Sequence, residues 1–142
     1  HNLQLLDSIM ETAATISAFF ISNESVHNWV FYNKSTGSFE TCVITCLEEL
    51  QEIIMKMYKT GAYEGNAELP EYIKGGKSEY SKIIYVTSND DFDFINEDSD
   101  NSVSAVLISE HIENYKKTAS EYSYISVIQT GKVAECIDNI YL

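Results

Sequence analysis

The sequence predicts an α/β protein with an N-terminal helix, a β-hairpin and a mostly parallel sheet flanked by helices. Residues 3–60 hold two segments with apolar residues at helical spacing and, between them, two segments of strand-like composition. In residues 82–141, three short β-rich runs are each followed by a helical segment. That chain order is typical of parallel strands joined by right-handed crossovers. A length of 142 residues suits one domain, residues 1–142, with a candidate internal boundary in the connection 61–79.

The first helix and the hairpin are predicted from local patterns. Residues 3–21 carry one broad apolar face, so we expect an amphipathic helix there. Asp7 and Glu11 interrupt its apolar run and no basic residues precede it, so we interpret it neither as a signal peptide nor as a membrane span. Residues 28–33 and 38–45 are predicted as two strands joined by a turn, with Gly37 at a positive φ.

The helix predicted for residues 46–60 has the clearest signals. Thr45 and Glu48 match a Thr-x-x-Glu capping box. Glu48 and Glu49 in the first turn, with lysines in the last, complement the helix dipole. Gly61 suits the position that follows the last turn. The apolar stripe expected to face the core consists of Leu47, Leu50, Ile53, Ile54, Met57 and Tyr58.

The remaining chain is predicted to alternate between strands and helices. Residues 61–79 contain four glycines and the only proline, and they are predicted as a long connection with a short helical turn at residues 71–73. Beyond it, strands are expected at 82–87, 103–108 and 124–129, with apolar residues on both faces. Helices are expected at 89–95, 110–118 and 132–141.

The charge balance restricts the classes of partner. Nine lysines, no arginine and 22 acidic residues give a formal net charge of −13. Phosphate recognition needs clustered basic side chains, so we expect no nucleic-acid partner. The same field repels an anionic membrane surface and attracts a basic protein, such as a toxin or an enzyme. Three cysteines without paired spacing indicate free thiols and a cytoplasmic location.

The first candidate site is the acidic segment of residues 90–100. Aromatic side chains among carboxylates supply an anchor as well as electrostatic steering, so we expect this segment to dock on a basic partner. The predicted partner-binding residues, which include two tyrosines of the glycine-rich connection, are Asp93, Phe94, Glu97, Asp98, Asp100, Tyr63 and Tyr72. A calcium loop starting at Asp98 is excluded, because Val103 and Ser109 stand where it needs Gly and Glu.

The second candidate site is the carboxyl edge of the predicted parallel sheet, where ligands of open α/β sheets bind. The residues that follow the strands carry hydroxyl, carboxylate, imidazole and amine groups. The candidate ligand-binding residues are Asp90, Asp91, Ser109, His111, Thr130 and Lys132. The alternative is that Ser88, Ser109 and Thr130 only cap the helices that follow them, a position that hydroxyl side chains favour.

No motif in the chain specifies a reaction. The acidic pair after one strand, with a hydroxyl and a lysine after a later one, is similar to response-regulator receiver domains, but the middle strand ends in Ser109-Glu110 with no Asp to accept a phosphate. No complete catalytic set or metal-ligand spacing occurs, so we expect no cofactor or metal and favour a protein that is not an enzyme. The leading hypothesis is an acidic inhibitor or immunity-type protein that neutralises a basic partner. The alternative is a ligand-binding regulatory domain excised from a larger protein.

Overall fold

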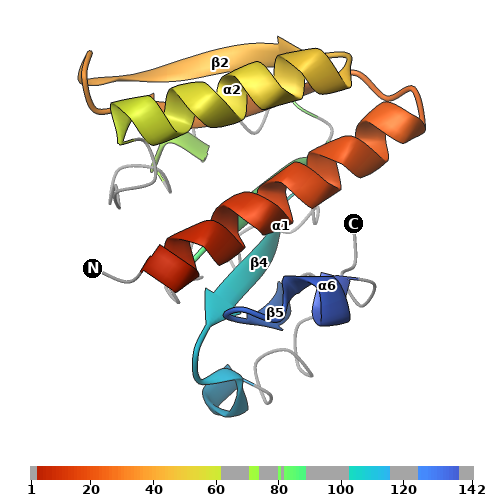
Figure 1. The fold of residues 1–142 in the computed structure, drawn as a ribbon, viewed down its shortest axis with the longest axis vertical. Helices are drawn as coiled ribbons and strands as arrows, with labels where there is room; N and C mark the ends of the chain where they lie inside the picture. Colours follow the sequence, from red (N-terminus) through yellow and green to blue (C-terminus); the bar gives the residue numbers. More distant parts are fainter. Residues whose placement is uncertain are drawn as a thin grey trace. The chain divides into compact units, whose positions relative to one another are not determined.

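The computed structural model has the α/β class that the sequence predicts (Figure 1). It describes residues 3–61, 71–73, 80, 82–88, 103–115 and 125–137. The helices and strands are α1 (Leu3–Ser22), β1 (His27–Asn33), β2 (Ser38–Ile44), α2 (Leu47–Thr60), β3 (Ile83–Thr87), β4 (Val103–Ser109), the 3₁₀ helix η2 (Ile112–Tyr115), β5 (Ile125–Gln129) and α6 (Val133–Cys136). The strands form an antiparallel pair, β1-β2, and a parallel sheet in the order β3-β4-β5.

The chain divides into two compact units, which are described separately below. The hairpin unit is Ala13–Leu69, and the sheet unit combines His1–Thr12 with Pro70–Leu142. The helix α1 contributes its first part to the sheet unit and its second part to the hairpin unit. A single domain over residues 1–142 stays a prediction of the sequence.

In the hairpin unit, the turn between β1 and β2 has the geometry that the sequence predicts. The two strands pair from His27 opposite Ile44 to Asn33 opposite Ser38. Gly37 has a φ of 70°, a conformation that glycine adopts without steric cost, and its N–H donates to the carbonyl oxygen of Asn33 at 2.8 Å. These contacts fix the strand register, so that Trp29 and Phe31 lie on one face of the hairpin.

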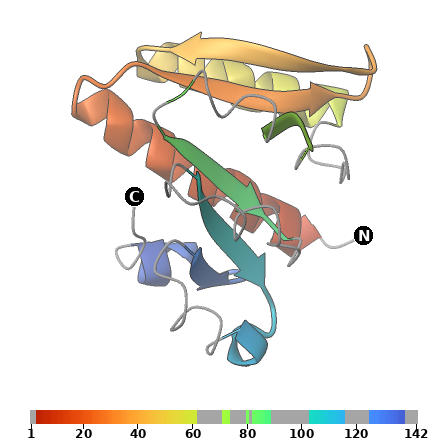
Figure 2. The same ribbon diagram turned by 180° about the vertical axis from the view of Figure 1, so that it is seen from behind.

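The helix α2 packs on the hairpin through one face. Figures 1 and 2, seen from opposite sides, both show α2 running along the two strands. The buried residues of α2 are Leu50, Ile53 and Met57. They are three and four residues apart, which places them on one face of the helix. The indole Nε1–H of buried Trp29 donates to the sulfur of Met57 at 2.9 Å. This contact ties the helix to β1 at the centre of the unit.

The start of α2 differs from the predicted capping box. The N-cap is Cys46 rather than Thr45, and it has an extended backbone and no side-chain cap bond. The third helical residue is therefore Glu49 and not Glu48, and the side chain of Glu49 bonds the residues that precede the helix. Its carboxylate accepts from the Thr45 hydroxyl, from the Thr45 N–H at 3.2 Å and from the Cys46 thiol at 3.4 Å. The Thr45 hydroxyl first, and then the Cys46 thiol, lower the pKa of Glu49.

The end of α2 agrees with the prediction in one respect and departs from it in another. Gly61 closes the helix in the left-handed conformation, with a φ of 69° and its N–H bonded to the Met57 carbonyl. Lys59 lies in the last turn, beside the negative end of the helix dipole. Lys56 instead forms an ion pair with Glu40 of β2 at 3.2 Å. Helix and strand are therefore joined on their surface as well as in the core.

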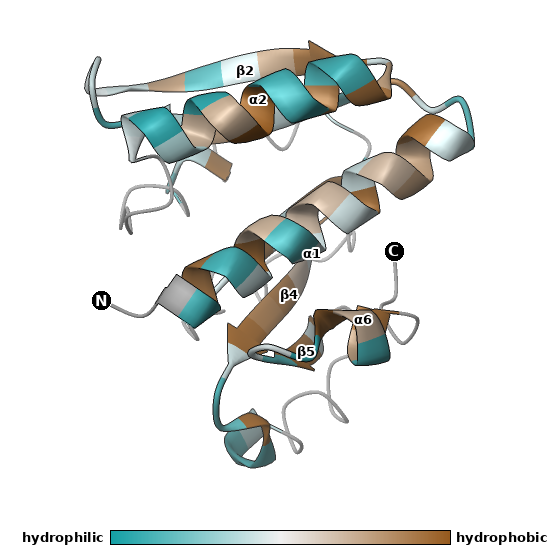
Figure 3. Cartoon of the chain, viewed as in Figure 1, coloured by the Kyte–Doolittle hydropathy of each residue, from teal (hydrophilic) through white to brown (hydrophobic). Residues whose placement is uncertain are grey.

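In the sheet unit, β4 is the central strand and the most deeply buried one. Every residue of β4 except Ser109 is buried, and Figure 3 shows the strand as hydrophobic along most of its length. The pairings Ile84 with Ser104 and Ile108 with Ile128 are parallel, as the strand-helix order predicts. The predicted strands are confirmed within one residue at each end. The burial of both faces of β4 explains its nearly unbroken apolar sequence.

The first part of α1 is attached to the loop after β5. Ser8 and Thr12 are buried, and their hydroxyls donate to the carbonyl oxygens one turn earlier in the helix. The Ser8 hydroxyl also accepts the N–H of Gly131 at 2.9 Å. Gly131 has a φ of 79°, a backbone conformation that glycine adopts without steric cost. A Cβ atom there would also meet the end of the Gln4 side chain, which is exposed and flexible enough to move aside.

The predicted helices of the sheet unit are described only in part. The expected helix 110–118 contains the 3₁₀ helix η2, and the expected helix 132–141 contains α6. Residues 71–73 are helical, which confirms the short turn predicted there. The expected helix 89–95 lies outside the described residues.

Candidate functional site

The structure brings two strand ends of the predicted ligand site together. The Ser109 carbonyl at the end of β4 accepts the Thr130 N–H at 3.0 Å, so the ladder between β4 and β5 extends one residue beyond β5. The Ser109 hydroxyl accepts the N–H of His111 at 3.1 Å. This bond reaches only two residues along the chain, before η2 begins at Ile112, so Ser109 forms a local serine turn and not the helix cap of the alternative interpretation. Asp90 and Asp91, assigned to the same site, lie outside the described residues.

Thr130 is the one residue of this edge with an unsatisfied buried group. Its side chain is 8 % exposed, and its Oγ1 is the only buried side-chain oxygen or nitrogen without a hydrogen-bond partner among the described residues. Buried hydroxyls normally have a partner, because desolvation without a hydrogen bond costs about 1–3 kcal/mol. The capping role considered for Thr130 is wrong, since this oxygen caps nothing.

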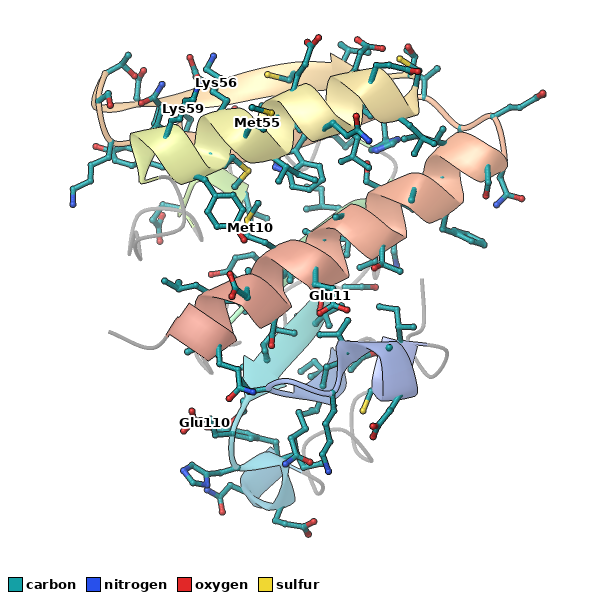
Figure 4. All side chains as sticks on the ribbon, in the orientation of Figure 1. Met10, Glu11, Met55, Lys56, Lys59 and Glu110 are labelled. Atoms are coloured by element: carbon teal, nitrogen blue, oxygen red, sulfur yellow. The ribbon has the colours of Figure 1, made fainter. Side chains whose placement is uncertain are left out.

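The charged residues of the edge are exposed. Glu110, His111 and Lys132 all lie at the surface, and Glu110 is labelled in Figure 4 beside the end of β4. Lys132 is the residue before α6 and donates its backbone N–H to the Gln129 carbonyl at 3.0 Å. The described part of this edge therefore carries exposed polar side chains and one buried hydroxyl. No described group of three or more His, Cys, Asp or Glu residues is arranged to hold a metal ion.

Most of the predicted partner-binding surface is not described. Six of its seven residues lie outside the described residues, and their role stays a prediction. These six are Asp93, Phe94, Glu97, Asp98, Asp100 and Tyr63. Tyr72 is described and has 38 % of its surface exposed. Its exposure is compatible with a contact surface, because tyrosine offers a large ring and a polar end.

The sequence interpretation missed an exposed surface on α2. Leu47 and Tyr58, assigned to the buried stripe, are 52 % and 43 % exposed, and Met55 is 60 % exposed. Leu47, Met55 and Tyr58 recur at spacings of eight and three residues, so they lie along one side of the helix. Glu48 and Glu52, both exposed and four residues apart, form an adjacent row. We call these five residues the α2 face.

A stricter helical-wheel count could have found the α2 face. The buried residues of α2, Leu50, Ile53 and Met57, span a narrow arc of the helix surface. A helix that packs on a two-stranded hairpin can bury an arc of this width and leave the rest of its surface exposed. Leu47 and Tyr58 lie outside that arc, and Met55 lies opposite it. Figure 3 shows the consequence, since hydrophobic and hydrophilic segments alternate along the visible side of α2.

The three cysteines are free and half-buried. Cys46 is bonded to Glu49, as described above, and Cys42 lies opposite Trp29 in the hairpin register. Cysteines in such positions act mainly as small apolar residues. Free thiols agree with the sequence expectation for these residues.

One described helix, α1, is long and apolar enough to cross a membrane, over the stretch Gln4–Ser22. Ser8, Met10 and Thr12, within that stretch, are buried in the protein. Figure 4 labels Met10 and Glu11 on this helix. The cytoplasmic location inferred from the sequence stays a prediction.

Comparison with known proteins gives no match: no protein-family model, no curated protein and no solved structure resembles this chain.

Proposed function

We propose that the chain is a small acidic binding protein that neutralises a basic protein partner, in the manner of an inhibitor or immunity protein. The observation that carries the proposal is the net charge of −13, reached without a single arginine. A field of this strength raises the rate of encounter with a basic partner and disfavours acidic competitors.

The described surface supports this proposal with an apolar anchor beside acidic groups. Charge alone steers a partner, whereas affinity needs buried contact area at the centre of an interface. The α2 face combines the exposed side chains of Leu47 and Met55 with the carboxylates of Glu48 and Glu52. Among the described residues it provides both components on one element.

The proposal predicts strong salt dependence of association. We expect a partner captured by the chain at low salt to be a protein with more basic than acidic residues. Its association rate constant should fall by about tenfold or more between about 0.05 M and about 0.5 M NaCl, because salt screens exposed charges. Surface plasmon resonance at several salt concentrations would measure this rate. A neutral or acidic partner, or a rate that salt does not change, would contradict the proposed function.

A ligand-binding regulatory domain is the second candidate, favoured by the unsatisfied hydroxyl of Thr130. This oxygen is buried at the carboxyl edge of a parallel sheet, which is where ligands of open α/β sheets bind. A small polar ligand reaching this edge would supply the missing hydrogen bond. Lys132, exposed two residues beyond Thr130, and His111, exposed two residues beyond Ser109, would supply further polar contacts.

This candidate predicts an unusual stability change for Thr130→Val. Valine has nearly the shape of threonine without the unsatisfied oxygen, so the free energy of unfolding should rise by about 1 kcal/mol. Thr12→Val is the matched control, because Thr12 is also buried and its hydroxyl donates to the Ser8 carbonyl at 2.7 Å. Its loss should lower the free energy of unfolding by about 1 kcal/mol. Urea titrations of both variants would measure these changes, and equal losses would remove the argument for a ligand.

A further inference from the structure

The exposed surface of α2 is chemically unusual for a helix that packs on a hairpin. Its core contacts use only Leu50, Ile53 and Met57. Three further large apolar side chains, Leu47, Met55 and Tyr58, keep 43–60 % of their surface exposed. Single exposed apolar residues are ordinary. Here Leu47 at the start of α2 and Met55 and Tyr58 near its end share one side of the helix, with the exposed Gln51 between them.

The charges beside this apolar row select the kind of partner. Glu48 and Glu52 are exposed and run parallel to Leu47 and Met55 along the first three turns of the helix. The neighbouring carboxylate of Glu49 is occupied by Thr45 and Cys46. Of the two lysines of α2, Lys56 is paired with Glu40, and Lys59 lies in the last turn, seven residues beyond Glu52. The carboxylates of Glu48 and Glu52 are exposed at the other end of the helix, where a cation of a partner can reach them.

We propose, building on the proposed function, that the α2 face docks a cationic amphipathic helix of the basic partner. The apolar side of that helix would cover Leu47, Met55 and Tyr58, and its lysine or arginine residues would pair with Glu48 and Glu52. An amphipathic helix fits because it carries an apolar row beside a basic row. These would lie against the apolar residues of the α2 face and against Glu48 and Glu52, respectively. Met55, labelled in Figure 4 on α2, has a flexible and polarisable side chain that adapts to different apolar surfaces.

The test uses a defined probe, a fluorescently labelled synthetic peptide of leucine and lysine that forms an amphipathic helix of about 18 residues. Binding to the full chain is followed by fluorescence anisotropy. Glu48→Gln with Glu52→Gln should weaken binding by about fivefold or more, and so should Leu47→Ser with Met55→Ser. Glu24→Gln with Glu135→Gln is the matched control: it removes two exposed carboxylates outside the α2 face, one of them also in the first turn of a helix.

The control separates the docking face from the general charge. If the Glu48/Glu52 double variant and the Glu24/Glu135 double variant weaken binding equally in this assay, the peptide responds to the net charge of the chain and not to the α2 face. That result would contradict the docking site and leave the proposed function intact. If the wild-type chain does not bind the peptide, the docking site is also wrong. The proposed function is tested separately. It is contradicted by a captured partner that is neutral or acidic, or by an association rate constant that salt does not change. Circular dichroism of each variant confirms that the substituted residues, all exposed, leave the fold intact.

Discussion

Replacing Ile128 by alanine should lower the free energy of unfolding by about 2–5 kcal/mol. Ile128 is fully buried on β5 and pairs with Ile108 of the central strand. Removing most of its side chain loses apolar contacts and leaves a cavity that the surrounding side chains fill only in part. Urea denaturation followed by far-ultraviolet circular dichroism would measure the change. Ile128→Val should cost about 0.5–1.5 kcal/mol, so an alanine variant no less stable than the valine variant would contradict the described core.

The same variant tests the single-domain prediction. Trp29 is the only tryptophan of the chain and belongs to the hairpin unit. Its fluorescence therefore follows the unfolding of that unit, while circular dichroism follows both units. If residues 1–142 are one cooperative domain, Ile128→Ala should shift both transitions to the same lower urea concentration. A fluorescence transition that stays at the wild-type midpoint would show that the units unfold independently.

Trp29→Ala should lower the free energy of unfolding by a comparable amount, about 3–5 kcal/mol. The indole is buried and bonded to the Met57 sulfur, so the substitution removes both the largest side chain of the hairpin core and its tie to α2. Chemical denaturation with circular dichroism detection would measure the loss.

Two matched variants show which part of the indole matters. Trp29→Phe keeps a ring in the core and loses the N–H···S bond, so it should be less destabilising than Trp29→Ala. Val26→Ala, at a side chain that is 66 % exposed, should stay within about 0.5 kcal/mol of the wild type. If Trp29→Ala were as mild as Val26→Ala, the packing of α2 on the hairpin would be wrong.

The sequence predicted the helices and strands of the described chain because their signals are local. The periodicity of residues 3–21, the positive φ of Gly37 and the glycine after α2 each depend on a few neighbouring residues. The capping box was wrong for a related reason. The N-cap is Cys46, one position after Thr45, and sequence signals place the end of a helix only to within one or two residues.

The candidate sites were harder to predict because they depend on tertiary contacts. Chain order placed Ser109 and Thr130 at one edge of the sheet, but the unsatisfied state of Thr130 follows from the side chains around it. Likewise, the apolar residues of α2 did not reveal which of them would be covered. A helical wheel of residues 46–60 orders these residues around the axis, but how wide an arc is buried depends on the two-stranded hairpin against which the helix packs.

The hydrogen bond between Ser8 and Gly131 also has a consequence for how the chain folds. It joins residues 123 positions apart, and it lies within one compact unit. Contacts this distant in sequence require a large loop to close before any interaction offsets the lost entropy, which slows folding relative to proteins built from local contacts. On the ribosome, Ser8 and Thr12 emerge long before Gly131 is synthesised. The side of α1 that carries Ser8 and Thr12 therefore stays exposed to solvent until the residues around Gly131 have been synthesised.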